Sequence, residues 1–350
     1  MWWNRCRSKA LNDERRVAVL LVGYGEVEEY QNFAAYNEMA LRLLTAKFLK
    51  IPEFGFKLLA GTLARKDRRE WAGRDNFRSP HNDVFEAQRA GIARHLQEYF
   101  GERVEVFKAF NFCEGYLPQQ VLAQIRARGF RRLLIYPLLV IDSIFTSGLA
   151  LQQINEALAE EERWVDALRY LPSFYNESDF HERLASHIEG HLQRLCTRHQ
   201  PSRIGIVLVN HGSPYEVKGF TTGIEESQFL YERVRERLIT RYPLISIGWL
   251  NHDTPGKWTT PDVPQAARNL LTVGASALLF CPIGFVTENH ETILDVEAIM
   301  QRFEQKAIPC TRLDCLNDDP QFLAAAAGWV EPLVGELLSV RSGQAVAAQE

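Results

Sequence analysis

Two side chains that can bind metal ions and transfer protons each stand at the end of an apolar run. His211 ends the run IGIVLVNH, and Glu291 follows the run LLFCPIGFV. Eighty residues separate them (291 − 211), but side chains at the carboxyl ends of strands in one open α/β sheet can meet at one edge. An imidazole and a nearby carboxylate suit metal delivery coupled to deprotonation. The alternative is an ordinary helix N-terminal His and a solvated Glu.

The apolar runs that must position this pair occur twice in the chain. VAVLLVGYGE at 17–26 matches IGIVLVNHGS at 204–213, and GFRRLLIYPL at 129–138 matches GASALLFCPI at 274–283. Helical patterns separate such runs, which indicates buried parallel strands in right-handed βαβ units. The predicted fold class is therefore α/β, with two doubly wound Rossmann-like lobes, each a parallel sheet flanked by helices, and a cleft between them.

The lobe boundary is expected near LRYLPSFYNESDF, where Pro172 and polar residues interrupt the periodicity. We therefore expect a first lobe at 17–170 and a second lobe, carrying His211 and Glu291, at 171–322. A helix at 323–342 is expected to pack back on the first lobe.

The repeat places different side chains in the two halves. Tyr24 stands in the register of His211, and Thr146 stands in the register of Glu291. The first half should therefore supply a wall of the site. Tyr24, Tyr36 and Phe33, together with Trp258, could form the apolar faces of a slot for a flat ring. The alternative reading makes these aromatic residues ordinary core.

Composition excludes several functional classes. The 350 residues are 46% apolar and 24% charged, enough for a large core. A net charge of −4 without a basic run argues against nucleic acid as a binding partner. The sequence contains no P-loop motif, so nothing in it predicts nucleotide binding. No continuous apolar stretch reaches the ~18 residues of a transmembrane helix, and no signal peptide is recognisable. We expect a soluble cytoplasmic protein, with peripheral membrane contact and oligomeric state left open.

Two motifs have a specific resemblance. CPIGFVTENHETILD at 281–295 resembles the ferrochelatase signature P-[IV]-G-F-[VA]-S-D-H-x-E-T-L-x-[ED], and VNHGSP at 209–214 resembles S-A-H-G-x-P of the same family. Weaker likenesses are FRSP at 77–80, FNFCEGYLP at 110–118 and YPLLVIDSIFTSG at 136–148. In order and spacing the resemblance runs from about Val17 to about Asp319.

The resemblance implies an ATP-independent chelatase that inserts its substrate Fe²⁺ into a porphyrin, protoporphyrin IX or coproporphyrin III, in heme biosynthesis. His211 and Glu291 would act at the ring centre as metal ligands and proton acceptors, with the division of roles open. Bending the ring exposes its pyrrole nitrogens to a fixed base. Fe²⁺ tolerates mixed imidazole and carboxylate ligation.

Further site residues follow from the same resemblance. Asp295 would share a helix face with Glu291 as a proton or metal relay, with Thr287 or Glu288 capping the helix. The next relay position is Ile299, which shortens the relay. The predicted substrate-binding residues are Tyr24, Tyr36, Arg78, Thr146, Ser147 and Trp258. Arg78 belongs to a basic stretch that could hold propionates or be solvated surface: Arg65, Lys66, Arg68, Arg69, Arg74 and Arg78.

The cysteines do not suggest a cofactor. Some ferrochelatases carry a four-cysteine iron–sulfur cluster, but Cys310 and Cys315 are the only close pair among six cysteines. We therefore expect reduced, mostly buried thiols and no iron–sulfur cluster.

Several positions depart from the family pattern. Asn289 replaces a His, His290 is shifted by one position, His252 replaces an Arg, and Glu26 stands in the place of the Thr of G-T-P. These departures leave two alternatives open. One is a non-catalytic paralogue that binds a tetrapyrrole or heme, and the other is a chelatase for another ring or metal, such as a sirohydrochlorin-type ring with Co²⁺ or Ni²⁺.

Overall fold

The computed structural model describes residues 16–27, 33–45, 52–71, 78–143, 146–159, 164–215, 221–252 and 256–340. Side chains are described within these ranges except at 44–45 and 66–71. Arg74 and the side chains of Lys66, Arg68 and Arg69 therefore lie outside the description, and their contact with propionates stays a prediction.

The first lobe is built on a four-stranded parallel sheet in the order β2-β1-β3-β4. Its strands are β1 (Val17–Gly23), β2 (Val104–Phe110), β3 (Arg132–Pro137) and β4 (Ala167–Tyr170). The helices that follow the first three strands are α4 (His81–Phe100), α5 (Pro118–Ala127) and α6 (Ser147–Ala159), with α2 (Phe33–Thr45) and α3 (Glu53–Trp71) inserted after β1. Every residue of β1 is buried, as expected for a strand covered on both faces.

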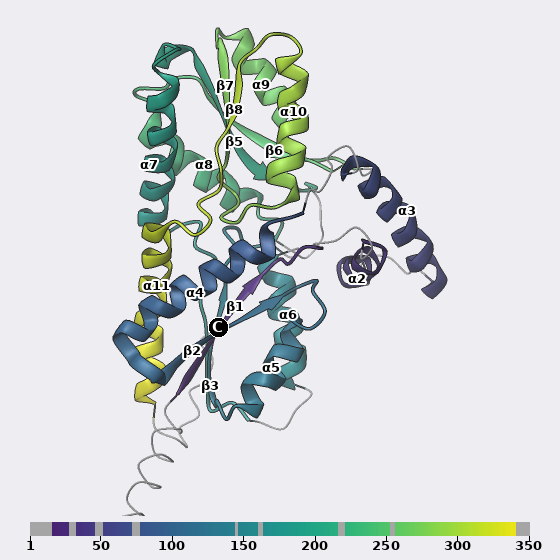
Figure 1. Cartoon of the computed structure of the whole chain (residues 1–350), viewed down its shortest axis with the longest axis vertical. Helices are drawn as coiled ribbons and strands as arrows, with labels where there is room; N and C mark the ends of the chain where they lie inside the picture. Colours follow the sequence, from purple (N-terminus) through teal and green to yellow (C-terminus); the bar gives the residue numbers. More distant parts are fainter. Residues whose placement is uncertain are drawn as a thin grey trace, which may run out of the picture.

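The second lobe repeats this arrangement in the order β6-β5-β7-β8. Its strands are β5 (Ile204–His211), β6 (Ile245–Leu250), β7 (Ala277–Pro282) and β8 (Cys310–Arg312). Its helices are α7 (Ser178–Leu195), α8 (Ile224–Leu238), α9 (Val263–Thr272) and α10 (Val296–Glu304). The predicted fold class is confirmed: both sheets are parallel and flanked by helices (Figure 1).

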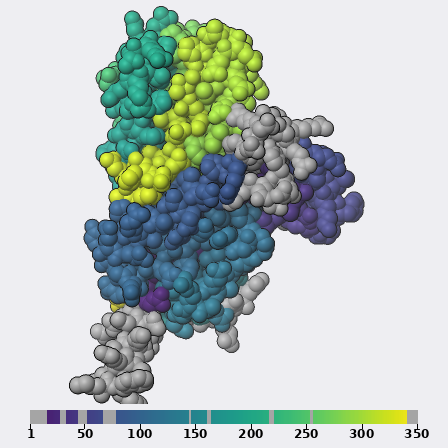
Figure 2. All heavy atoms as spheres, in the orientation of Figure 1, coloured from purple at the N-terminus to yellow at the C-terminus, as the bar shows by residue number. Residues whose placement is uncertain are grey.

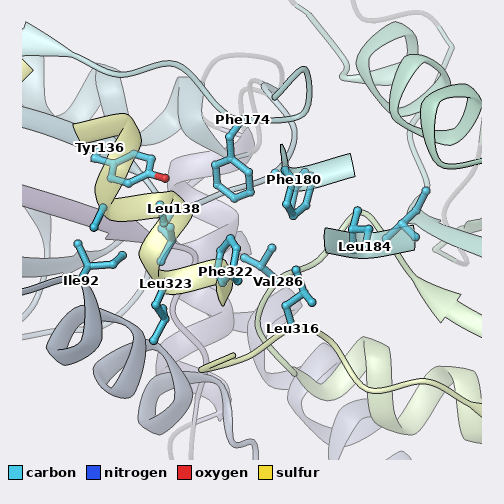
Figure 3. Packing of buried hydrophobic residues seen from close by; sticks show 14 of the residues in the cluster. Ile92, Tyr136, Leu138, Phe174, Phe180, Leu184, Val286, Leu316, Phe322 and Leu323 are labelled. Carbon is cyan, nitrogen blue, oxygen red and sulfur yellow. The ribbon is translucent and has the colours of Figure 1, made fainter. Parts of the chain in front are cut away.

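The largest hydrophobic cluster joins the two lobes. It contains residues of β1 and β3 together with residues of β5 and β7. Phe174 links the lobes, because its ring lies 6.4 Å from that of Tyr136 in β3 and 5.0 Å from that of Phe180 in α7. Figure 3 shows Phe322 between Leu138 and Val286, with Phe174 and Phe180 nearby in the same cluster. A shared core of this kind restricts how the lobes move relative to each other.

Helix α11 (Pro320–Ser339) is long and apolar enough to cross a membrane, by length and composition alone. This differs from the expectation that no apolar stretch of the sequence is long enough for a transmembrane helix. In the structure α11 packs along α4 and against strands of the first lobe (Figure 1). Phe322, Val330 and Val334 are buried there, so the helix serves as part of the core. The lobe limits given above remain a proposal.

Helices α2 and α3 form a hairpin that projects from the body of the first lobe (Figure 2). Its base is a small cluster in which Phe33 and Val27 pack on Leu294 of the second lobe. Phe33 is 5% exposed, so it is a core residue of this cluster. This favours the alternative of ordinary core for Phe33, and its contact with a flat ring stays a prediction.

Asp319 fixes the start of α11. Its carboxylate accepts a hydrogen bond from the Phe322 N–H at 2.9 Å and two from the Arg183 guanidinium at 2.7 and 2.6 Å. Burial by itself raises the pKa of Asp319, but these donors outweigh it and hold the pKa below its usual range. The carboxylate therefore ties α11 to α7.

We expect Asp319→Asn to lower the free energy of unfolding by about 1.5–3 kcal/mol at pH 7, the range for hydrogen bonds to a charged group. Asparagine keeps the helix cap but loses the ion pair. Because the folded pKa is depressed, the stabilisation is complete above the unfolded pKa of about 3.9 and disappears as pH falls through the folded value. Urea denaturation at pH 7 and pH 3 measures the free energy of unfolding of the variant and the wild type. Asp318→Asn, at an exposed neighbouring position, is the control. A loss of equal size at both pH values would contradict the ion-pair explanation.

Candidate metal centre

His211 is the last residue of β5, and its backbone surroundings orient the imidazole. Nδ1 lies 2.6 Å from the Gly212 carbonyl oxygen, so Nδ1 carries the proton and Nε2 keeps a lone pair. The Gly212 N–H donates to the carbonyl of Leu250, the last residue of β6, at 2.7 Å. A Cβ at position 212 would lie 2.1 Å from Asn251 Oδ1. Only glycine therefore lets the ends of β5 and β6 approach this closely.

His252 lies in the loop that follows β6. Asn251 Nδ2 donates to the Thr259 carbonyl at 2.8 Å, and the Thr259 hydroxyl donates back to Asn251 Oδ1 at 3.1 Å. The same hydroxyl accepts the Ser213 N–H at 3.1 Å. This buried threonine thus connects the loop after β5 with the loop after β6 and holds His252 beside His211. Sequence reasoning treated His252 only as a lost arginine.

Glu291 opens a π-helical segment, η4 (Glu291–Asp295), that continues into α10. Asn289 Oδ1 accepts the Thr292 N–H at 2.8 Å, and Thr292 Oγ1 accepts the Asn289 N–H at 3.0 Å. Asn289 is therefore the cap, and the expected caps Thr287 and Glu288 are wrong. Thr287 instead donates to Gln88, and the Glu288 carboxylate pairs with Arg312 at 2.8 Å.

The three side chains converge at the edge of the second sheet. The Nε2 atoms of His211 and His252 are 3.1 Å apart, and Glu291 Oε1 lies 3.6 and 3.9 Å from them. Ligands about 2.1 Å from a metal are about 3.0–3.4 Å apart. Among the residues that the structure describes, this is the one group of three potential metal ligands within 4.8 Å of one another. The predicted pair is brought together, and His252 joins it.

The carboxylate of Glu291 is unusually placed. The residue is 9% exposed, and its Oε2 atom is buried with no hydrogen-bond partner in the described part of the chain. Burial by itself would raise the pKa of Glu291, but His211, His252 and His290 outweigh it and hold the pKa well below its usual range. A buried anion with one unsatisfied oxygen is suited to receive a cation or an N–H donor.

Burial also lowers the pKa of His211, but the charge of Glu291 and its hydrogen bond outweigh this and raise the pKa above its ordinary value. Two imidazole nitrogens that face each other at 3.1 Å need a proton or a metal ion between them. Protons and divalent cations therefore compete for the same three side chains.

His290 points away from the trio of His211, His252 and Glu291, as expected from its shift by one position. Its Nδ1 forms a very short contact with the carboxylate of Glu26, which belongs to the first lobe. Burial lowers the pKa of His290, but Glu26 outweighs it and raises the pKa to about 10. Sequence reasoning missed Glu26, and its one visible signal was an acid in place of the Thr of G-T-P.

Tyr24 and Tyr36 stand on the first-lobe side of the trio. The Tyr36 hydroxyl donates to the Gly25 carbonyl at 3.1 Å, and the Tyr24 ring packs edge-on against Phe112. Burial first, then the charges of Glu291 and Glu26, raise the pKa of Tyr24, so it stays a neutral phenol. Tyr24 follows β1 of the first lobe, whereas Glu291 belongs to the second lobe. Contact of either tyrosine with a ring stays a prediction.

Three other predicted substrate contacts use their polar groups elsewhere. The Thr146 hydroxyl donates to the Ile141 carbonyl at 3.0 Å, and the Ser147 hydroxyl donates to Asp142 at 2.7 Å. Arg78 is exposed and lies 3.4 Å from the Asp83 carboxylate. Their roles in substrate binding stay predictions, and in this conformation Thr146 and Ser147 shape the turn before α6.

The proposed relay beyond Glu291 is short. Asp295 ends η4 and is exposed, which suits a group that exchanges protons or hydrated ions with solvent. Ile299 is buried in the core of the second lobe and continues no polar path. The relay role of Asp295 stays a prediction.

Trp258 lies beside the trio, with its ring 5.8 Å from that of His252 at an interplanar angle of 78°. We expect Trp258→Ala to weaken porphyrin binding by about 1–3 kcal/mol, the range for losing an aromatic stacking partner. Fluorescence titration measures the affinity, and a thermal melt on the same sample measures stability. A lower melting temperature with normal porphyrin affinity would mean that Trp258 only supports its loop.

Comparison with known proteins decides the family. The model of the family described as Ferrochelatase matches residues 16–333. The chain belongs to the ferrochelatase family. Ferrochelatase from Synechococcus elongatus is 26% identical over 338 residues, which cover 90% of this chain and 82% of that protein. Ferrochelatase from a Cyanothece species is 23% identical over 325 residues, with coverage of 88% and 80%. The resemblance drawn from the two motifs is confirmed.

Solved structures agree on the fold. SirB from Bacillus subtilis, solved with Fe³⁺, has a TM-score of 0.51 at 11% identity and covers 93% of this chain and 96% of its own. The sirohydrochlorin chelatase SirB from the subspecies spizizenii, in complex with cobalt, has a TM-score of 0.51 at 10% identity. At these identities the likeness concerns the fold alone. Membership of the ferrochelatase family implies a metal-ion substrate and a tetrapyrrole substrate.

Proposed function

We propose that this member of the ferrochelatase family inserts Fe²⁺ into a porphyrin, protoporphyrin IX or coproporphyrin III, without ATP, as a cytoplasmic enzyme of heme biosynthesis. The observation that supports it best is the convergence of His211, His252 and Glu291, three potential metal ligands within 4.8 Å of one another. The second carboxylate oxygen of Glu291, Oε2, is buried without a hydrogen-bond partner in the described part of the chain. Two imidazoles and one carboxylate with open positions suit Fe²⁺. A three-ligand site also leaves room for the ring nitrogens that must take over the metal.

In this proposal the trio handles both the metal and the protons. Glu291 supplies the negative charge, and His211 offers Nε2 because its Nδ1 proton is held by Gly212. Two of the four ring nitrogens carry protons, and both protons must leave as the ring takes the divalent metal. An imidazole positioned beside the ring can accept such a proton. The ring would lie between the trio and Tyr24, with Trp258 at its rim.

One observation favours a second candidate. His252 adds an imidazole where the family pattern has an arginine, and nitrogen-rich sites bind Co²⁺ and Ni²⁺ more tightly than Fe²⁺. A chelatase for one of these metals with a sirohydrochlorin-type ring is therefore the alternative enzyme. The other departures from the motifs keep a non-catalytic tetrapyrrole-binding paralogue as the third reading.

A substrate panel separates the three readings. The purified full chain is mixed anaerobically with protoporphyrin IX, coproporphyrin III or sirohydrochlorin and with Fe²⁺, Co²⁺ or Ni²⁺, and absorbance follows metal insertion. Multiple turnovers with Fe²⁺ and a porphyrin support the proposal, whereas turnover only with sirohydrochlorin supports the second candidate. Spectral shifts that stop at one equivalent of protein indicate a carrier. The His252→Arg variant, which restores the family residue, should shift metal preference away from Co²⁺ and Ni²⁺.

A further inference from the structure

We infer that Glu26 of the first lobe is a positioning residue that holds the segment carrying Glu291 in place across the lobe boundary. The inference rests on the proposed function of the trio as a metal site, and it concerns a residue that lies outside that trio.

The carboxylate of Glu26 holds His290 at two points. Its Oε2 accepts the His290 backbone N–H at 3.2 Å, and its Oε1 forms a very short contact with His290 Nδ1. The hydroxyl of Ser79, which is also a first-lobe residue, donates a hydrogen bond to Oε2. Because His290 directly precedes Glu291, a first-lobe carboxylate thus fixes both the backbone and the side chain at the start of the helix.

Glu26 is itself held rigidly. Its N–H donates to Asn82 Oδ1 at 3.1 Å, and its carbonyl accepts from Asn82 Nδ2 at 2.8 Å, so one side chain of α4 holds the residue at both backbone groups. The preceding Gly25 has φ of +80°, and a Cβ there would lie 2.5 Å from Phe110. The turn that sends Glu26 inward therefore requires glycine. Glu26 is 3% exposed.

The other end of the same segment is also held from the first lobe. Gln88 of α4 donates to the Val286 carbonyl at 3.1 Å and to the Asn317 carbonyl at 2.9 Å, and it accepts from the Thr287 hydroxyl at 3.0 Å. Residues 286–290 are thus held at both ends by the lobe that does not carry the trio. Gln88 acts at the far end, whereas Glu26 acts one residue before Glu291.

This arrangement affects metal binding because the three ligands are positioned by different parts of the protein. His211 and His252 are placed by loops of the second lobe. The segment that carries Glu291 is instead held from both lobes, by Arg312 at Glu288 and by Glu26 at His290. Loss of the Glu26 contact should displace one ligand of three. Substitution of residues that orient metal ligands commonly weakens metal binding by 10- to 100-fold.

The test compares Glu26→Gln and Glu26→Asp with the wild-type full chain. Glutamine removes the charge, and aspartate keeps the charge but is one methylene too short to reach His290 in the same pose. Glu86→Gln is the control, since it removes a first-lobe carboxylate paired with Arg89 and Lys108. Hydrogen–deuterium exchange of the metal-free proteins reports on residues 284–296. Anaerobic titration with Co²⁺ gives the affinity and the visible spectrum of the bound ion.

We expect both Glu26 variants to show faster exchange at 284–296, about 10- to 100-fold weaker Co²⁺ binding and an altered Co²⁺ spectrum, and the control to match wild type. If Glu26→Gln does not fold, the exchange and Co²⁺ measurements on Glu26→Asp alone test the inference. Unchanged exchange would overturn the inference, and so would faster exchange with unchanged Co²⁺ affinity and spectrum, because Glu26 would then be purely structural. Absence of Co²⁺ binding by the wild type would overturn the metal site itself, and exchange would still decide whether Glu26 holds the segment.

Discussion

Replacing His211 with alanine is expected to abolish metal insertion and leave the fold intact. The substitution removes the imidazole whose Nε2 lies 3.1 Å from His252 and 3.6 Å from Glu291. Loss of the proton acceptor alone slows such a step by about 10² to 10⁴. The His211 side chain is half exposed at the end of β5, so the free energy of unfolding should change by less than about 0.5 kcal/mol. Anaerobic insertion assays and urea denaturation measure the two effects.

The matched control for this variant is His187→Ala. His187 is a histidine of the same lobe, but it lies on α7 and contacts the Asp314 carbonyl instead of the trio. It should retain full insertion activity. Turnover near the wild-type rate in His211→Ala would remove His211 from the mechanism, and the metal would then have to be held by His252 and Glu291 alone.

Replacing Glu291 with glutamine should slow insertion by about 10² to 10⁴ while porphyrin affinity stays nearly unchanged. Glutamine keeps the shape and hydrogen-bonding capacity of the side chain. It cannot accept a proton or carry the negative charge that His211, His252 and His290 stabilise. Because the pKa of Glu291 lies well below its usual range, the carboxylate is ionised at neutral pH, and the defect should be constant between about pH 6 and pH 8.

Steady-state kinetics at saturating porphyrin and porphyrin titration together test this expectation. Glu297→Gln is the control, because it changes an acid two residues beyond the π-helical segment. If porphyrin affinity collapses in Glu291→Gln while the rate at saturation persists, Glu291 positions the ring and does not act on its protons. A defect that appears only at one end of the pH range would contradict the ionised state assigned to the carboxylate.

The strands, and the two strand ends that carry His211 and Glu291, can be predicted from local sequence patterns alone. Runs such as 17–23 and 204–209 are apolar at every position because both faces of a parallel strand are covered, so they are readable without tertiary information. The matching runs in the two halves placed His211 and the segment of Glu291 at the carboxyl edge of one sheet. The motifs around these two residues also predicted the family to which the chain belongs.

The tertiary structure decided which other groups reach this edge. His252 lies 41 residues from His211, and Glu26 lies 264 residues from His290. No local pattern predicts such contacts, because they depend on which loops become neighbours in the fold: the ends of β5 and β6 in one case, and the segments after β1 and β7 in the other. The cap at Asn289 was missed for a related reason. Thr287 and Glu288 are also good caps, but contacts with Gln88 and Arg312 use their side chains, and only packing reveals that competition.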